Sequence, residues 1–361
     1  MSERLQNRAE VLKLARLLGV DVADLPALDD VPAASLAEFR NAATDRLFDE
    51  SARTLGRVGA ASKLVPSPIV ATIAEKAFGP LLCARAAGAV DPSKAVDVAR
   101  RLSPIFLADV AIELDPRRVA AIIAAVPDTL VVPVAEELGR REEHVTMGRF
   151  LAFVSDDAIV AAMGVLSDEA MLRTAFVLEH KDKLDHAVGL LPADRVPGVL
   201  ERASELGLWA EALDLLDHLS EERRGPIADT LAGLSQSVVG ELVTAVSQAH
   251  LWDSLLPIVR LMSPDACARL AAAPAFHDAA VLRSIVEAAA AQDLWLDVVP
   301  LIDHLPGERG LGEVLLAAIT EADLVATLVS AAPVAALDAI GRYATRAGLT
   351  TELDAVLATV A

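Results

Sequence analysis

The densest cluster of groups able to do chemistry in this chain lies between Gly139 and Val154. Seven charged or polar side chains fall within ten residues: Arg140, Arg141, Glu142, Glu143, His144, Thr146 and Arg149. Guanidinium groups bind carboxylates and carbonyls through a planar fork and are enriched at binding interfaces. A helix would place Glu142 beside Thr146 and Val145 beside Arg149. We take this corner as the candidate partner- or ligand-binding site; the alternative is a solvated corner with local ion pairs.

A second group of titratable residues follows in the segment LEHKDKLDH, with Glu179, His180, Asp182, Asp185 and His186. Asp182 and His186 are four residues apart, so one helix face could present both to a metal. Two ligands do not complete a site, and Cys83 and Cys267 match no metal-binding spacing. The chain also has no phosphate-binding glycine loop, no G-x-S-x-G elbow and no H-E-x-x-H motif. The sequence therefore predicts no enzyme, no cofactor and no metal site.

The elements that position these groups are set by a twelve-residue repeat from Asp91 to Leu178. Its segments read DPSKAVDVARRL, SPIFLADVAIEL, DPRRVAAIIAAV, PDTLVVPVAEEL, SDDAIVAAMGVL and SDEAMLRTAFVL. Within a segment, apolar residues recur at the spacing of one helix face. Asp or Ser opens five of the six segments as an N-cap, and proline often follows at the first helical position. Each segment is predicted to be one short helix, and Gly139–Val154 interrupts the repeat with sixteen residues instead of twelve.

A longer repeat begins at Val196. Trp209, Trp252 and Trp295 stand 43 residues apart, each at the start of a helical pattern. Two or three helices per 43 residues is the size of a HEAT or armadillo repeat, and Thr350 takes the tryptophan position in a degenerate terminal repeat. The tryptophans are interpreted as core wedges; the alternative is an aromatic row along a binding groove. His218 and His304 are predicted to lie at helix C-termini, in structural positions.

The N-terminal part is less regular. Residues 3–18 and the stretch from Ser35 to about Lys63 are predicted to be helices, with Leu36 and Phe39 on one apolar stripe. The most apolar part of the chain follows at residues 66–90. We expect it to form the buried first layer of the helical array; the alternative is an amphipathic surface that docks on an anionic membrane.

Composition limits the function. The net charge is −20, although residues 51–101 carry eight basic and three acidic groups. An acidic surface repels phosphate backbones, so the sequence argues against nucleic acid as a partner. No signal peptide and no uninterrupted apolar run of membrane-spanning length are present. With two distant cysteines, these features predict a soluble, cytoplasmic protein with reduced thiols.

The twelve-residue segments end in a repeated punctuation: Leu102-Ser103-Pro104, Leu114-Asp115-Pro116, Leu166-Ser167-Asp168 and Leu191-Pro192. Residues 91–191 thereby resemble the N-terminal superhelical domain of MgtE-type magnesium transporters, and are similar to the middle domain of the flagellar switch protein FliG. The resemblance implies a right-handed superhelix used as a regulatory or docking surface. In the transporters this domain responds to Mg²⁺ and packs against CBS domains and a membrane pore. This chain has neither part, so the resemblance implies the fold and not transport.

These observations predict an all-α protein of the α-solenoid class, a right-handed superhelix of short antiparallel helices with HEAT- or armadillo-like repeats at its C-terminal end. The predicted domains are an N-terminal helical cap at residues 1–65, twelve-residue half-repeats at 66–195 and tryptophan-marked repeats at 196–361. The expected function is a non-catalytic scaffold or adaptor that binds a protein partner along the superhelix. The alternatives are a small-ligand or Mg²⁺ sensor or carrier, and peripheral membrane docking through residues 66–90.

Overall fold

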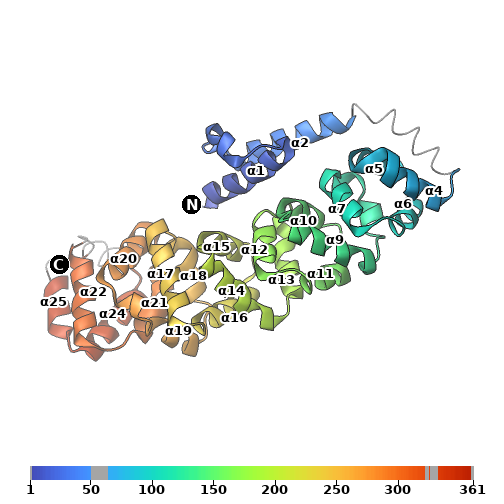
Figure 1. Cartoon of the computed structure of the whole chain (residues 1–361). Helices are drawn as coiled ribbons and strands as arrows, with labels where there is room; N and C mark the ends of the chain where they lie inside the picture. The colour runs from blue at the N-terminus through green and yellow to red at the C-terminus, as the bar shows by residue number, and fades with distance from the viewer. Residues whose placement is uncertain (1, 50–63, 322–324, 326–331, 359–361) are drawn as a thin grey trace. The chain divides into compact units, whose positions relative to one another are not determined.

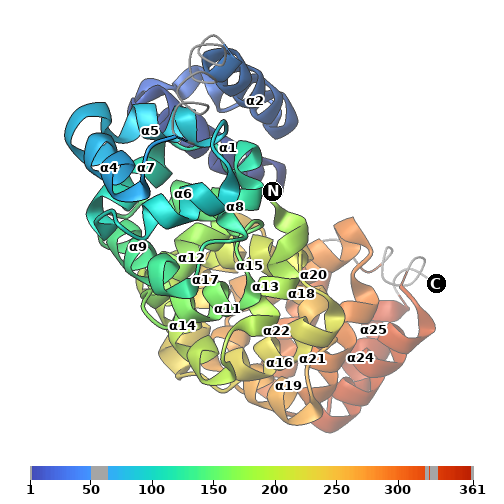
Figure 2. The same ribbon diagram turned by 90° about the vertical axis from the view of Figure 1, so that its right-hand side faces the viewer.

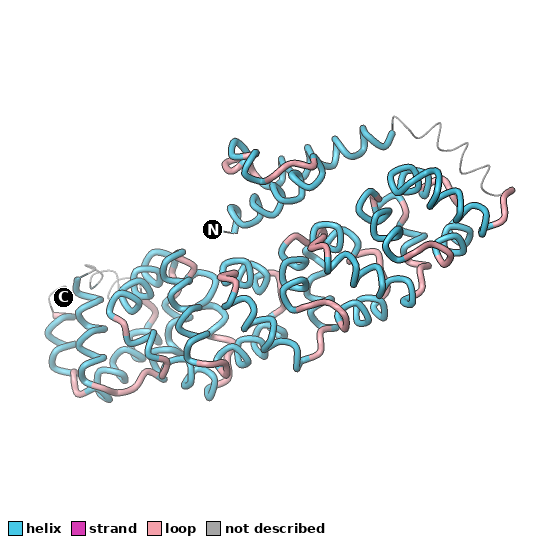
Figure 3. The backbone as a smooth tube through the Cα atoms, viewed as in Figure 1, coloured by secondary structure: helices cyan, strands magenta, loops and turns pink. Residues whose placement is uncertain are grey.

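The computed structural model describes residues 2–49, 64–321, 325 and 332–358. Over these residues the chain forms helices and connecting loops without a β-strand (Figure 3), which confirms the predicted all-α class. The chain divides into two compact units, Met1–Pro192 and Ala193–Ala361. Figure 1 colours the first unit from blue to green and the second from yellow-green to red. Within the described residues, no helix is both long enough and apolar enough to cross a membrane.

The first unit opens with a helical hairpin of α1 (Ser2–Leu18) and α2 (Ala33–Asp49), which pack against each other. Its small core contains Val11, Leu14 and Leu36, covered by apolar side chains of the connecting loop. The predicted helix from Ser35 to Lys63 thus begins at Ala33, and its residues 50–63 lie outside the described part. Leu36 is buried, whereas Phe39, predicted to lie on the same apolar stripe, is 60% exposed.

The twelve-residue segments form short helices, as predicted. They are α6 (Pro92–Ala99), α7 (Pro104–Glu113), α8 (Ala120–Ile123), α9 (Asp128–Arg140), α11 (Asp156–Met163) and α12 (Asp168–Phe176), and α13 (Leu184–Leu190) follows them. The expected N-caps are confirmed, because the side chains of Asp91, Ser103, Ser155 and Ser167 each accept a hydrogen bond from a backbone N–H of the first turn. Asp115 instead caps a 3-10 turn, Pro116–Arg118, and α8 begins only after it.

Packing in the first unit links helices that lie two places apart in the sequence. α5, α7, α9, α11 and α13 contact one another in succession, as do α4, α6 and α8. Small side chains let the backbones approach: Ala108 and Ala111 of α7 share a core with Leu138 and Met147. Because each helix is too short to bury its apolar face alone, it is stable only between such neighbours.

The apolar segment at residues 66–90 forms α4 (Ser67–Ile73), a π-helical turn (Ala74–Phe78) and α5 (Gly79–Ala87). Alanines make its buried face: Ala71, Ala74, Ala84 and Ala86. Its large apolar side chains lie outside, with Ile69 51% and Leu82 46% exposed and Ile73, Phe78 and Leu81 similarly accessible. The expectation that this segment is a buried layer is therefore wrong for these side chains, because the small residues alone supply the packing face. Membrane docking by this segment stays a prediction.

The second unit repeats a three-helix pattern, in which each tryptophan begins the second helix. The bounds are α14 (Val196–Glu205), α15 (Trp209–Asp217), α16 (Glu221–Ala232), α17 (Gln236–Ala249), α18 (Trp252–Val259), α19 (Pro264–Ala271), α20 (Ala279–Gln292), α21 (Trp295–His304), α22 (Arg309–Glu321), α24 (Val334–Ala347) and α25 (Thr350–Leu357). Contacts run from α16 to α19, α19 to α21 and α21 to α24, which Figure 2 shows side by side. Thr350 is the first residue of α25, at the position where the preceding three repeats have tryptophan.

The tryptophans are core residues. Trp209, Trp252 and Trp295 are 3%, 1% and 4% exposed, so they do not form an aromatic row along an open groove. His218 and His304 lie at the C-terminal ends of α15 and α21, where each ring Nδ1 is 2.7 Å from a backbone carbonyl oxygen four residues earlier. Their predicted structural placement is confirmed.

Candidate functional site

The corner at Gly139–Val154 consists of the end of α9, a tight turn and one additional helix. α9 ends at Arg140, Glu142 has a left-handed φ of 58°, and α10 spans His144–Phe150. Glu142 therefore lies outside any helix, and its expected side-by-side placement with Thr146 is wrong. Val145 and Arg149 do share α10. Gly148 keeps α10 close to α12, because a Cβ there would come within 3.1 Å of the Val177 carbonyl oxygen.

Two arginines of the corner are used in local ion pairs. Arg140 lies 2.7 Å from Glu137, and Arg141 lies 2.6 Å from Glu137 and 2.5 Å from Asp109. Hydrogen bonds from Arg140 and Arg141 lower the pKa of Glu137 to about 2. His144 is partly buried beside them, and desolvation, followed by the charge of Arg173, lowers its pKa. These groups form the solvated, ion-paired part of the corner.

The other end of the corner faces a cavity of about 360 Å³ in the first unit, bounded by the α1–α2 hairpin and by the helical array. Val145, Thr146 and Arg149 of α10 line it. Its wall carries three carboxylates and six cations, the latter being Lys13, Arg16, Arg40, Arg85, Arg117 and Arg149. A cation-rich wall is unexpected in a chain of net charge −20. Four of these six cations have a carboxylate partner: Lys13, Arg16, Arg40 and Arg117.

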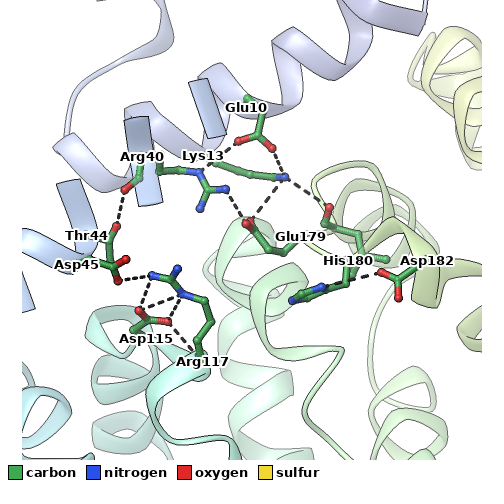
Figure 4. Close-up of polar contacts among 11 residues, drawn as sticks. Glu10, Lys13, Arg40, Thr44, Asp45, Asp115, Arg117, Glu179, His180 and Asp182 are labelled. Atoms are coloured by element: carbon green, nitrogen blue, oxygen red, sulfur yellow. Dashed lines mark hydrogen bonds and ion pairs between the residues drawn. The ribbon is translucent and has the colours of Figure 1, made fainter. Parts of the chain in front are cut away.

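Four of the charges at this site form a balanced network (Figure 4). Lys13 Nζ donates to Glu10 Oε1 at 2.6 Å and lies 3.7 Å from Glu179 Oε2. Arg40 donates to Glu10 at 3.2 Å and to Glu179 at 2.6 Å. Burial alone raises the pKa of Glu179, but the charges of Lys13 and Arg40 outweigh it and lower that pKa. These two cations and two carboxylates thus neutralise one another between the hairpin and the array.

A second pair involves Asp115, whose side chain is 1% exposed. Arg117 donates to both of its carboxylate oxygens and also reaches Asp45 of α2 at 3.1 Å. Desolvation raises the pKa of Asp115, and the hydrogen bonds and charge of Arg117 reverse this, so the net shift is downward. Asp115 and Glu179, two of the three carboxylates that line the cavity, therefore stay ionised and already have cationic partners.

Arg149 lines the same cavity and has no carboxylate partner among the described residues. Its Nη2 donates to the carbonyl oxygen of Leu114 at 3.1 Å, at the end of α7. Among the described residues, no carboxylate lies within 4.0 Å of its guanidinium group, although Asp115 and Glu179 attract it from further away. A guanidinium has five N–H donors, so four have no acceptor among the described side chains and backbone groups. Burial lowers the pKa of Arg149, because its charge is poorly compensated.

The remaining wall is apolar and aromatic. Leu81, Ile112 and Phe153 line it. His180 packs edge-on against Phe153 with ring centroids 5.8 Å apart, and its buried Nε2 has no hydrogen-bond partner among the described residues. The cavity therefore combines a cationic end with an apolar wall, the mixture typical of sites for small organic anions.

Two segments singled out in the sequence thus meet here: Thr146 and Arg149 from the corner, Glu179 and His180 from the second cluster. The suggested metal pair does not converge, since His186 Nε2 lies 2.8 Å from Asp156 while Asp182 lies beside His180. Over the described residues, no group of three or more His, Cys, Asp or Glu side chains is placed to hold a metal ion. Sequence reasoning missed Lys13 and Arg40, whose one signal was a charge on otherwise buried faces of α1 and α2.

Comparisons of the chain with protein-family models, with curated proteins and with solved structures give no match. The resemblance to the MgtE N-terminal domain consequently stays a prediction from the repeated punctuation.

Proposed function

We propose that this chain is a non-catalytic α-solenoid scaffold or adaptor whose first unit binds an anionic ligand in the cation-rich cavity. The observation that carries the proposal is Arg149, a partly buried guanidinium with one hydrogen bond and no carboxylate within 4.0 Å among the described residues. A phosphate or carboxylate group would compensate this charge and accept its free N–H groups in a bidentate geometry.

The rest of the site supports the same function. Asp115 and Glu179 are already paired with Lys13, Arg40 and Arg117, so the charge of Arg149 is left for an incoming anion. The volume of the cavity, about 360 Å³, is at the lower end of the range for small-molecule sites. The succession of short helices packed two places apart supports the solenoid part of the proposal.

Titration calorimetry with inorganic phosphate at constant ionic strength tests the proposal. Phosphate is expected to bind with a stoichiometry near one, and Arg149→Gln to weaken the affinity by about 10- to 100-fold, since a hydrogen bond to a charged group contributes about 1.5–3 kcal/mol. Arg101→Gln is the matched control, because Arg101 is an exposed arginine of the same unit that pairs only with Asp97. Absence of phosphate binding, or equal loss in both variants, would contradict the proposal.

A further inference from the structure

The cations of the cavity come from two separate parts of the first unit. Lys13 and Arg16 belong to α1 and Arg40 to α2, whereas Arg85, Arg117 and Arg149 belong to the helical array. An anion bound among them therefore contacts both parts at once. Its affinity depends on the hairpin lying against the array.

The hairpin does not need the array for its own core. Val11, Leu14 and Leu36 pack with apolar residues of the loop between the two helices. Asn7 of α1 closes this loop by donating to the carbonyl oxygens of Leu28 and Val31. These apolar side chains therefore pack within the hairpin itself.

Several contacts from the hairpin to the array are ion pairs. They include Arg16 with Glu143 at 2.8 Å, Arg40 with Glu179 at 2.6 Å and Asp45 with Arg117 at 3.1 Å. Exposed ion pairs contribute little, and buried ones offset their attraction with a desolvation cost. Arg149, which lines the same cavity, has no carboxylate within 4.0 Å among the described residues. Because an uncompensated charge is costly to bury, this guanidinium opposes docking until an anion pairs with it.

We infer that the cavity is a ligand-operated latch: a small organic phosphate, held by cations from both parts, fixes the α1–α2 hairpin against the array, and the hairpin is released when the ligand leaves. The inference rests on the proposed function. A phosphomonoester supplies the counter-charge that Arg149 lacks, and the wall of Leu81, Ile112 and Phe153 fits an apolar or aromatic body. Because the ligand binds only the docked hairpin, linkage makes ligand binding and docking stabilise each other.

Double electron–electron resonance spectroscopy on the full chain measures the distance between the hairpin and the array. Spin labels go on Glu38→Cys of α2 and Glu136→Cys of α9, two exposed positions, in a background where Cys83 and Cys267 are replaced by alanine. Phenyl phosphate is the probe, with inorganic phosphate and phenyl sulfate at matched ionic strength for comparison. The expected result is a broad distance distribution that narrows to one short-distance population as phenyl phosphate saturates the site. Half-saturation should need at least about tenfold more ligand in Arg149→Gln and be unchanged in Arg101→Gln.

The outcomes separate the inference from the proposed function. If calorimetry shows phenyl phosphate binding but the distance distribution is the same with and without it, the latch is wrong and the anion site stands. If neither phenyl phosphate nor inorganic phosphate binds, both are wrong. Tighter binding of inorganic phosphate than of phenyl phosphate would contradict the apolar wall as part of the site. Arg149→Lys provides a second test should Arg149→Gln lose helicity: it keeps the charge, loses the fork, and is expected to weaken latching less than the neutral variant.

Discussion

At the scale of single residues, burial alone does not identify function in this chain. Trp252 is 1% exposed, its Nε1 donates to Ser284 at 2.9 Å, and its ring lies against Phe276. Arg149 is partly buried, but its charge has no carboxylate partner within 4.0 Å among the described residues. The contacts of Trp252 stabilise the fold, whereas the charge of Arg149 destabilises it unless a negative charge compensates it. This contrast separates packing residues from the candidate site.

The tryptophan gives a prediction at this scale. Trp252→Ala should lower the free energy of unfolding of the second unit by about 3–5 kcal/mol, because it deletes a fully buried large aromatic side chain and its hydrogen bond. Urea unfolding followed by the fluorescence of Trp209 and Trp295 measures it. The matched control is Leu296→Ala, a 47% exposed position, with an expected change within about 0.5 kcal/mol. Similar small changes in both variants would show that Trp252 is not a core wedge.

At the scale of elements, close approach between short helices depends on small residues. Gly225 lies inside α16, and a Cβ there would come within 3.1 Å of the Leu261 carbonyl oxygen in the next repeat. Gly240 lies inside α17, where an added Cβ would meet no atom within 4 Å. The two glycines share a helix-interior setting and differ in what faces them.

Alanine at the two positions should therefore have opposite effects. Gly240→Ala is expected to stabilise the second unit by about 0.5–1 kcal/mol, since alanine loses less backbone entropy in a helix. Gly225→Ala gains the same propensity but must displace a backbone carbonyl, and a net destabilisation of about 1–2 kcal/mol is expected. Urea unfolding by tryptophan fluorescence measures both variants. Equal stabilisation by both would mean that the contact between α16 and the following repeat is looser than described.

At the scale of the whole molecule, charge is unevenly shared between the units. Residues 184–361, nearly all in the second unit, carry 25 acidic and 10 basic groups. In that unit, burial raises the pKa of Asp217, with the neighbouring Asp214 adding to the shift. In the first unit, the net pKa shifts of Asp115 and Glu179 are downward despite burial, because cationic partners stabilise their ionised forms. The two units should thus respond oppositely to acid.

Proton linkage determines whether each unit gains or loses stability as the pH falls. A raised carboxyl pKa means that the ionised form costs stability at pH 7, so Asp217 should contribute a gain in stability to the second unit as pH falls from 7 toward about 3.9, the ordinary aspartate pKa. A lowered pKa means that the stabilisation is present at pH 7 and lost below about 4, so the first unit should then lose stability. Calorimetric scans from pH 7 to pH 3 measure both, and tryptophan fluorescence identifies the transition of the second unit. Asp217→Asn should reduce the gain in the second unit and leave the first unit unchanged; parallel shifts of both transitions would contradict this account.

Much of the local structure follows from the sequence. An Asp or Ser cap, a proline at the first helical position and an apolar face are interactions within about a dozen residues, so the repeats located the helices after Asp91, Ser103, Ser155 and Ser167. The same local argument placed His218 and His304 at helix ends. The corner at Gly139–Val154 was visible because it interrupts a regular repeat.

Only the tertiary structure decided which of these polar groups meet. Local ion pairs were one alternative for the corner at Gly139–Val154, yet Arg149 reaches the carbonyl oxygen of Leu114, and Glu143 pairs with Arg16. Glu179 pairs with Arg40, 139 residues away in the sequence. No periodicity encodes such pairings, because a charged side chain has many partners of opposite sign and the folded backbone selects among them. The sequence determined where the helices lie along the chain; the packing of the hairpin against the array decided that, among the described residues, Arg149 has no carboxylate partner.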